Sequence, residues 1–384
     1  MAGLPGRMTS IGGRWTAVAA VSIAAAGIVA IAPSAGAAPA PNSFAQTNLI
    51  ANKASFHPKL VDPALKNAWG LAAGPNPLWV SDNNSGVATV YQGGIAGGAV
   101  TKLLTVPVPG GNPTGQVYNP SSAFVAVPGW QTVFIVDSDS VGSTQSPGEI
   151  AAWPGFGSFV VEVSPKGGPG GKTPAGAVFK GLALATTPKA GPELFAADVH
   201  NARIDVFNGA FHLVKTPAEF RDKKIPLGYA PFNIQLLGNR LYVTYGLQNK
   251  AKTDVVPGKG RGFVDVYSVN GFLIKHLVSH GALNEPWGLA IAPAGFGPFV
   301  GKLLVGNLGN GWINVYNPTT GAYLGWLKRP NGTPVAIPEL WGLMVGNSQF
   351  GGSHSLVFSA GPNSYNNGIV GVLNPAPPSG GGGW

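Results

Sequence analysis

The strongest constraint on this chain is a unit of short apolar strands that recurs six times. In one copy, residues 284–290 (Asn-Glu-Pro-Trp-Gly-Leu-Ala) precede an apolar run at 303–307, a tight turn at 308–311 and a further run at 312–316. The glycine or asparagine of the first run falls at residues 70, 115, 181, 233, 288 and 342, so successive units lie 45, 66, 52, 55 and 54 residues apart. Periods near 50 with several strands per unit are typical of β-propellers, whose blades are four-stranded antiparallel sheets.

The two ends of the chain indicate how such a ring would close. A candidate fourth strand follows the third in most copies (100–106, 159–163, 272–278 and 323–327), but only a Pro/Gly-rich tail follows the sixth. The apolar segment 48–51 belongs to no unit, and it would complete the sixth blade and leave no free sheet edge. We therefore predict an all-β fold, a six-bladed β-propeller closed by an N-terminal strand. A seventh blade inside the long second unit, or two packed β domains, are the alternatives.

The N-terminal segment has the layout of a secretory signal peptide. Arg7 and Arg14 precede an alanine-rich apolar run at 15–31, and small residues at 35–37 offer a cleavage site. A retained membrane anchor is the alternative. We expect a secreted, extracellular protein with no stable membrane anchor after cleavage. The predicted parts are a signal peptide (1–37), a flexible leader (38–46), the propeller (47–374) and a disordered Pro/Gly tail (375–384).

Composition narrows the class of partner. The chain is 45% hydrophobic and only 10% charged, which separates it from disordered proteins, since those combine low hydrophobicity with high charge. It contains no cysteine, so disulfides cannot support the fold. The net charge is +9, but Lys and Arg occur mostly singly, without the basic stripe that nucleic-acid binding requires. We expect a monomer that binds a small-molecule or cell-envelope ligand and no nucleic acid.

Antiparallel pairing predicts where a site would lie. Within a blade, the first strand starts and the second strand ends at the same face, so these residues converge near the mouth of the central channel. Asp82, Asp137 and Asp198 end the second strand in three consecutive units, and their carboxylates would suit Ca²⁺. Binding of turn backbone by each aspartate is the alternative. The predicted ligand-binding residues at this mouth are Asn67, Trp69, Asn112, Lys180, Asn233, Tyr245, Asn284, Trp287, Asn307 and Trp341. The tryptophans among them serve either packing between blades or an aromatic platform for a ligand.

Candidates for catalysis are fewer. His200 lies two residues beyond Asp198, and the pair are candidate catalytic residues because histidine can act as a general base or a metal ligand. A histidine in a surface turn is the alternative. The other histidines form no zinc-type cluster, and the sequence has no Gly-x-Ser-x-Gly elbow. The glycine-rich insertion 250–262 lacks the following helix of a phosphate loop, and we interpret it as a mobile loop over one face.

The repeats resemble six-bladed propellers of the NHL and SMP-30 types, and more closely a family of uncharacterised secreted bacterial proteins with propeller-like repeats. The resemblance covers residues 48–373 and rests on segments 67–72, 113–115, 180–183, 197–201, 229–235, 262–267 and 283–290. Two departures are Val199, where a Phe is expected, and the Asn-Leu-Gly at 307–309, where an aromatic residue often stands. The resemblance implies the fold and no particular activity.

These observations predict a binding module with a ligand or cation site at the channel mouth. The alternative is a metal-assisted hydrolase or lyase that uses the same mouth, by analogy with lactonases of related architecture. Fold analogy is the sole support for that alternative, and one fold hosts many functions. The binding module and the enzyme differ in what they require of the site. An enzyme needs a base and a metal close together, whereas a binding module needs only a shaped mouth.

Overall fold

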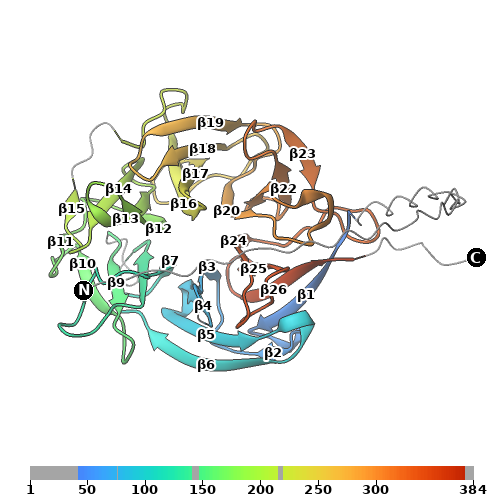
Figure 1. The fold of residues 1–384 in the computed structure, drawn as a ribbon, viewed down its shortest axis with the longest axis horizontal. Coiled ribbons are helices and arrows are strands. Elements are labelled where there is room, and N and C mark those ends of the chain that lie inside the picture. Colours follow the sequence, from blue (N-terminus) through green and yellow to red (C-terminus); the bar gives the residue numbers. More distant parts are fainter. Residues whose placement is uncertain (1–41, 76, 141–146, 215–218, 377–384) are drawn as a thin grey trace, which may run out of the picture. The chain divides into compact units, whose positions relative to one another are not determined.

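The computed structural model describes residues 42–75, 77–140, 147–214 and 219–376, which form six predominantly antiparallel sheets around a common centre (Figure 1). From the centre outwards, the first blade contains β3 (Ala68–Ala72), β4 (Leu78–Asp82), β5 (Val87–Gly93) and β6 (Val100–Pro107), and the second contains β7 (Pro113–Tyr118), β8 (Phe134–Ser138), β9 (Ile150–Trp153), β10 (Val160–Ser164) and β11 (Gly171–Lys172). The third contains β12 (Phe179–Thr187), β13 (Gly191–Asp198), β14 (Arg203–Asn208) and β15 (Leu213–Val214), and the fourth β16 (Tyr229–Leu237), β17 (Arg240–Leu247), β18 (Phe263–Ser268) and β19 (Leu273–Ser279).

The fifth and sixth blades complete the ring. The fifth contains β20 (Pro286–Ile291), β21 (Leu303–Asn307), β22 (Ile313–Tyr316) and β23 (Tyr323–Trp326), and the sixth β24 (Leu340–Val345), β25 (Leu356–Ala360), β26 (Ile369–Pro375), β1 (Phe44–Ala51) and β2 (Leu60–Val61). Short 3₁₀ helices at Ala54–Phe56, Asn83–Ser85, Ile95–Gly97 and Gly297–Phe299 lie in the connections. The innermost strands contact one another in turn, and β24 contacts β3. The predicted six-bladed, all-β propeller is therefore confirmed.

The ring closes as the sequence predicted. Strand β1 pairs antiparallel with β26, from Phe44 opposite Pro375 to Ala51 opposite Ile369. The strand begins at Phe44, so it includes the last residues of the segment that we expected to be a flexible leader (38–46). The extra length of the second unit adds the short fifth strand β11 to its sheet instead of a seventh blade.

Every blade has a β-bulge where its innermost strand pairs with the second strand. In the first blade Ala68 pairs with Asp82 but Leu71 pairs with Val80, so one extra residue lies on the innermost strand at the Trp-Gly pair. A bulge bends its strand and changes the direction of its side chains. The recurring sequence unit thus encodes a recurring bulge as well as a strand.

In five of the six blades a glycine of the bulge lies where neighbouring innermost strands approach closely. A Cβ on Gly288 would stand 2.5 Å from the carbonyl oxygen of Trp341, and one on Gly70 would collide with the carbonyl oxygen of Thr114. No real side chain tolerates such contacts, so glycine is required there. The same holds for Gly115, Gly181 and Gly342.

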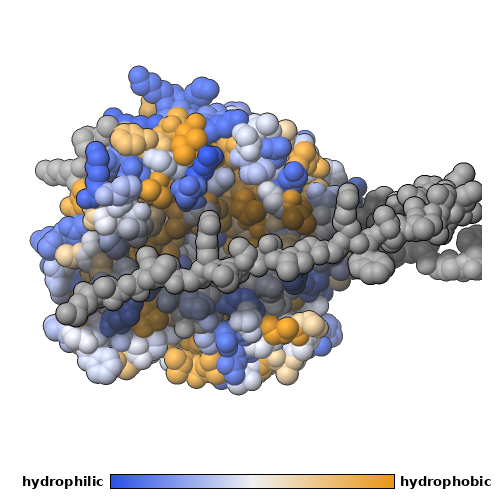
Figure 2. All heavy atoms as spheres, viewed as in Figure 1, coloured by the Kyte–Doolittle hydropathy of each residue, from blue (hydrophilic) through white to orange (hydrophobic). Residues whose placement is uncertain are grey.

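The hydrophobic core is divided among the interfaces between blades. Six clusters of buried apolar side chains each join two neighbouring blades, and a seventh lies at the centre. Between the first two blades, for example, Trp79 stacks on Phe134 with ring centroids 4.5 Å apart. Each sheet is therefore apolar on both faces, as radial packing requires. On the face in Figure 2, hydrophobic residues are scattered among hydrophilic ones.

The predicted signal peptide (1–37) and most of the predicted tail (375–384) lie outside the described residues. Within the described ranges, no helix is long and apolar enough to cross a membrane.

Closure by β1 predicts a large effect of one N-terminal side chain. Phe44 is fully buried and packs against Phe296 and Phe299, at centroid distances of 4.5 and 6.3 Å. Phe44→Ala should lower the free energy of unfolding by about 3–5 kcal/mol, because a buried aromatic ring is lost. Gln46→Ala, at an exposed position of the same strand, should change it by less than about 0.5 kcal/mol. Urea denaturation measures both, and equal stabilities would contradict closure by β1.

Candidate functional site at the channel mouth

Three tryptophans meet at the centre of the ring. Trp69 stacks on Trp341 with ring centroids 3.5 Å apart, and Trp287 meets both edge-on at 6.2 and 5.8 Å. Their exposed fractions are 3%, 1% and 5% for Trp69, Trp341 and Trp287, and Phe232 of the fourth blade packs in the same cluster. These indoles, predicted as ligand-binding residues, are packed against one another, so they support the mouth without offering an open platform.

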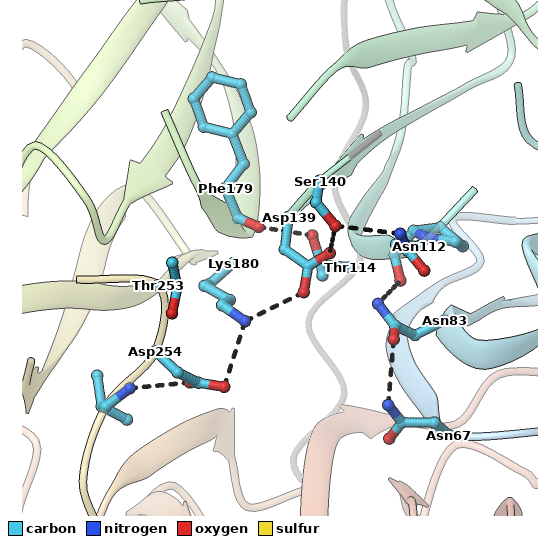
Figure 3. Close-up of polar contacts among 12 residues, drawn as sticks. Asn67, Asn83, Asn112, Thr114, Asp139, Ser140, Phe179, Lys180, Thr253 and Asp254 are labelled. Atoms are coloured by element: carbon cyan, nitrogen blue, oxygen red, sulfur yellow. Dashed lines mark hydrogen bonds and ion pairs between the residues drawn. The ribbon is translucent and has the colours of Figure 1, made fainter. Parts of the chain in front are cut away.

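Lys180, the second residue of β12, is the charged centre of this mouth. Its Nζ lies 3.2 Å from Asp139 Oδ2 and 3.5 Å from Asp254 Oδ2 (Figure 3). The same atom lies 4.8 Å from the centroid of the Trp69 ring. The side chain is only 3% exposed. Burial by itself lowers the pKa of Lys180, but the carboxylates of Asp254 and Asp139 outweigh burial and raise that pKa above its ordinary value. Lys180 is therefore held as an ammonium ion.

The ion pairs open onto a cavity of about 330 Å³, which we call the mouth pocket, lined by Asp139, Ser140, Val178, Lys180, Asn249, Thr253 and Asp254. Two of its carboxylates reach solvent, since the Asp139 and Asp254 side chains are 20% and 42% exposed. The pocket thus combines one buried cation with two accessible anions and several neutral polar groups. Such convergent polar groups in a concave pocket are typical of small-molecule sites.

The insertion 250–262 forms one wall of the mouth pocket. Asp254 pairs with Lys180, and the neighbouring Val255 is buried in the central cluster of tryptophans. The backbone amide of Gly258 donates a 2.7 Å hydrogen bond to Asn284 Oδ1. The segment that the sequence suggested to be a mobile loop is thus anchored at several points, and it supplies functional groups.

The predicted asparagines hold neighbouring groups in place. Asn67 Oδ1 accepts a 3.0 Å hydrogen bond from the Trp341 indole, and Asn233 Nδ2 donates one of 2.8 Å to the carbonyl of Trp287. Asn112 Nδ2 donates to Ser140 Oγ at 3.1 Å (Figure 3). Asn67 and Asn112 both have positive φ angles, 51° and 49°, a conformation that asparagine tolerates better than most residues. These amides position the indoles and the rim of the pocket.

Two other predicted ligand-binding residues, Tyr245 and Asn307, have partners away from the pocket. The Tyr245 hydroxyl lies 2.8 Å from that of Tyr267, in the core between the third and fourth blades. Asn307 Oδ1 accepts a hydrogen bond from the backbone amide of Asn284, and its Nδ2 donates to Ala282. These side chains stabilise blades and connections.

The three aspartates proposed as a calcium site are not brought together. Among the described residues, the group of three potential metal donors is a different one, which is discussed below. Each aspartate accepts a hydrogen bond within its own blade: Asp82 from Thr89 Oγ1 (2.6 Å), Asp137 from Thr114 Oγ1 (2.8 Å) and Asp198 from Asn201 Nδ2 (2.6 Å). Burial raises the pKa of Asp137 to about 7 and that of Asp82 well above its ordinary value. Asp198 also accepts a hydrogen bond from the backbone amide of Asn201, as the alternative interpretation expects, whereas Asp82 and Asp137 bind threonine hydroxyls of their own blades.

His200 and Asp198 are not arranged as a catalytic pair. Asp198 Oδ1 accepts hydrogen bonds from the backbone amides of Val178 and Asn201, and Oδ2 accepts one from the side-chain amide of Asn201. The His200 ring lies against Gly176, where a Cβ would stand 2.6 Å from Nε2. The carboxylate is thus directed to the turn that follows β13.

Sequence reasoning missed Asp139, Asp254, Glu285 and Tyr365. Glu285 is 5% exposed, and burial, helped by Asp254 and opposed by Lys180, raises the pKa of its carboxyl to about 8. Tyr365 is 37% exposed, and its ring lies 5.9 Å from that of Trp341. One signal was available for Glu285, because it occupies the position of Asn67 and Asn112, directly before an innermost strand.

The fold and this site define a six-bladed β-propeller with a charged pocket at its channel mouth. No protein-family model matches the chain. It is 30% identical over 322 residues to an uncharacterised protein of Acanthamoeba polyphaga mimivirus, covering 81% of this chain and 76% of the relative. A second uncharacterised mimivirus protein is 30% identical over 328 residues, covering 81% of each. The chain belongs to the family of these proteins. They are viral, so they lend no support to the bacterial, secreted family that the repeats resemble.

Solved structures agree in fold alone. The soluble aldose sugar dehydrogenase of Escherichia coli superposes with a TM-score of 0.52 at 12% identity, covering 87% of this chain and 100% of that one. The GH93 α-L-arabinofuranosidase of Fusarium graminearum gives a TM-score of 0.52 at 13% identity, covering 86% and 97%.

The geometry predicts which carboxylate is coupled to Lys180. Lys180→Met should lower the free energy of unfolding by about 2–4 kcal/mol, because the carboxylates lose their buried partner. In a double-mutant cycle, Asp139→Asn should show a coupling of about 1–3 kcal/mol with Lys180→Met, whereas Asp198→Asn should show almost none. Urea denaturation of the wild type, the three single variants and the two double variants measures both cycles. A larger coupling to Asp198 than to Asp139 would contradict the arrangement.

The raised pKa of Glu285 predicts a dependence of stability on pH. Its carboxyl has an ordinary pKa of 4.5 and a pKa of about 8 in the folded protein, so the folded state binds this proton more tightly. Its contribution to the free energy of unfolding is therefore present at low pH and is lost as the pH rises from about 5 to 8. Glu285→Gln should reduce the fall in the free energy of unfolding between about pH 5 and pH 8. Glu339→Gln, at the equivalent position of the next blade, is the control, and an equal reduction in both variants would refute the assignment.

Proposed function

We propose that this protein is a binding module for a neutral, polyhydroxylated small molecule, such as a sugar, at the mouth pocket. The observation that carries the proposal is the buried Lys180 ammonium held between two partly exposed carboxylates at the edge of a pocket. Buried ion pairs add little net stability to a fold, since desolvation offsets their attraction. An ion pair that lines a pocket is better explained by a ligand that forms hydrogen bonds with the charged groups of the pair.

The chemistry of the pocket favours hydroxyl groups. A hydroxyl donates to a carboxylate and accepts from an ammonium, so adjacent hydroxyls can bridge Asp254 and Lys180. Asn249, Thr253 and Ser140 add neutral donors and acceptors to the lining. Lys180 and the two aspartates together carry one net negative charge, which disfavours an anionic ligand. Near the rim, the exposed ring of Tyr365 offers the aromatic face on which sugars commonly lie.

The alternative, a metal-assisted hydrolase or lyase at the same mouth, has less support. Such an enzyme needs several metal donors converging on one point. Within the described ranges, the group of three such donors does not include Asp82, Asp137, Asp198 or any residue of the mouth pocket. A binding role requires no such convergence.

Ligand binding is tested with the full-length protein and a panel of neutral mono- and disaccharides, with Ca²⁺ as a separate arm. A binding sugar should raise the melting temperature, because it stabilises the folded state by mass action, and titration calorimetry should confirm the affinity. Asp254→Asn should weaken that affinity by roughly tenfold or more, as expected for loss of a charged hydrogen-bond partner worth about 1.5–3 kcal/mol.

Glu219→Gln is the matched control, since it removes the same charge from a residue outside the mouth pocket. Its affinity should equal that of the wild type. No response to any sugar, or sugar binding that Asp254→Asn leaves intact, would overturn the proposal. A response to Ca²⁺ alone would favour the cation-dependent alternative.

A further inference from the structure

A second cluster of reactive side chains lies in the fourth blade, away from the mouth pocket. His276 on β19 lies with its Nδ1 2.6 Å from Asp222 Oδ2 and 2.9 Å from Asp265 Oδ1. The three side chains are 12%, 4% and 0% exposed for His276, Asp222 and Asp265. These facing atoms are buried, and among the described residues they have no other hydrogen-bond partner. The cluster is therefore organised around the imidazole.

The short distances favour a shared proton over a metal ion. Two donors bound to one metal at about 2.0–2.2 Å stand roughly 3 Å apart or more. The 2.6 Å between His276 Nδ1 and Asp222 Oδ2 is shorter than that, and it matches a charge-assisted contact between imidazole and carboxylate.

The other nitrogen of the same ring faces a serine. His276 Nε2 lies 2.6 Å from Oγ of Ser279, which is exposed to solvent. Residues three apart on a regular strand point to opposite faces, but β19 has a bulge here. Asp265 pairs with His276 and Val264 with Val278, so Leu277 is the extra residue. The bulge brings Ser279 and His276 to the same face, as bulges beside active sites do.

Both carboxylates are oriented by further hydrogen bonds. Asp222 Oδ1 accepts a 2.8 Å hydrogen bond from the backbone amide of Lys224, which leaves Oδ2 directed to the imidazole. Asp265 Oδ2 accepts one of 3.1 Å from the hydroxyl of Tyr267, which in turn lies 2.8 Å from the hydroxyl of Tyr245. Tyr245, which the sequence placed at the channel mouth, thus supports this cluster instead.

A cavity of about 260 Å³ adjoins the serine. Its lining includes Ser279 and Leu277 of the fourth blade and Tyr316 and Tyr323 of the fifth. Tyr316 is 2% exposed, and its hydroxyl has no hydrogen-bond partner among the described residues. Burial raises the pKa of Tyr316, so this hydroxyl stays protonated as a donor. The cavity offers apolar walls for a small acyl or aryl group.

We propose that Ser279, His276 and Asp222 form a hydrolytic triad that cleaves small, apolar esters at this cavity. Ser279 and His276 would be the catalytic residues, and Asp222 the positioning residue, with Asp265 as a second carboxylate facing the same imidazole nitrogen. Nucleophile, base and orienting carboxylate have the mutual distances that define such a triad, which is recognised by geometry and not by chain order. The spacing of these residues matches no sequence motif.

The proposed reaction is ester hydrolysis, with water as the second substrate. Ser279 Oγ attacks the ester carbonyl carbon while its proton passes to His276 Nε2. The bond from that carbon to the alkoxy oxygen breaks, and Nε2 returns the proton to the leaving oxygen, which departs as an alcohol. Water then attacks the acyl carbon and gives a proton to Nε2. The bond to Oγ breaks, Oγ recovers that proton, and a carboxylic acid leaves. The two carboxylates stabilise the imidazolium formed in each half.

Two measurements on the full-length protein test the triad. A fluorophosphonate probe, which an activated serine hydroxyl displaces with loss of fluoride, should modify Ser279, as located by peptide mass spectrometry. Hydrolysis of p-nitrophenyl acetate and butyrate should fall at least about a hundredfold in Ser279→Ala and in His276→Asn, the effect typical of losing nucleophile or base. Ser268→Ala and His212→Asn, outside the cluster, are the matched controls and should keep the wild-type rate.

Several results would overturn the proposal. One is a wild-type protein that neither reacts with the probe nor hydrolyses the esters, and another is a Ser279→Ala variant with the wild-type rate. Because Ser279 is exposed, this variant should melt like the wild type, so its result stands even where His276→Asn unfolds. A third is a melting temperature that Zn²⁺ or Ca²⁺ raises in the wild type but not in Asp265→Asn, which would make the cluster a metal site.

Discussion

The close approach of backbones at the centre of the ring is the contact on which the rest of the structure depends. Glycines such as Gly70 and Gly288 allow neighbouring innermost strands to meet without side chains between them. In the first, fifth and sixth blades the bulge also contains a tryptophan, and these three indoles fill the centre of the ring. With the blades held this close, their faces pack into one core cluster per interface. The indoles fill the centre at the mouth pocket, and a cavity of about 210 Å³ lined by the innermost strands lies beside them.

The sequence predicted the architecture well because each blade repeats the same local signals. It also predicted that Trp69, Lys180, Trp287 and Trp341 lie near one mouth, since that follows from antiparallel pairing alone. It placed Tyr245 there too, although position at a strand end does not determine which face a side chain takes. Asp139 and Asp254 were missed because they reach Lys180 from connecting segments, whose conformation is determined by contacts distant in the sequence.

The acidic residues are concentrated where they meet buried cationic or ionisable groups. The chain has only 15 of them. Asp139, Asp254 and Glu285 surround Lys180, and Asp222 and Asp265 face His276. A third of the acidic residues therefore lies beside the Lys180 and His276 side chains. The net charge of +9 follows from 24 lysine and arginine residues against 15 acidic ones, and it does not by itself indicate a polyanionic partner.

The pairing of β1 with β26 has a consequence for how the chain reaches its native state. Residues 44–51 are synthesised before the other strands of the propeller, yet their partner strand lies more than 300 residues later. Five blades can assemble from neighbouring segments while β1 has no partner. The sixth blade needs both ends of the chain, so its formation depends on the longest loop closure in the molecule. Such non-local pairing slows folding, and until it occurs, β26 offers an unpaired edge to other chains.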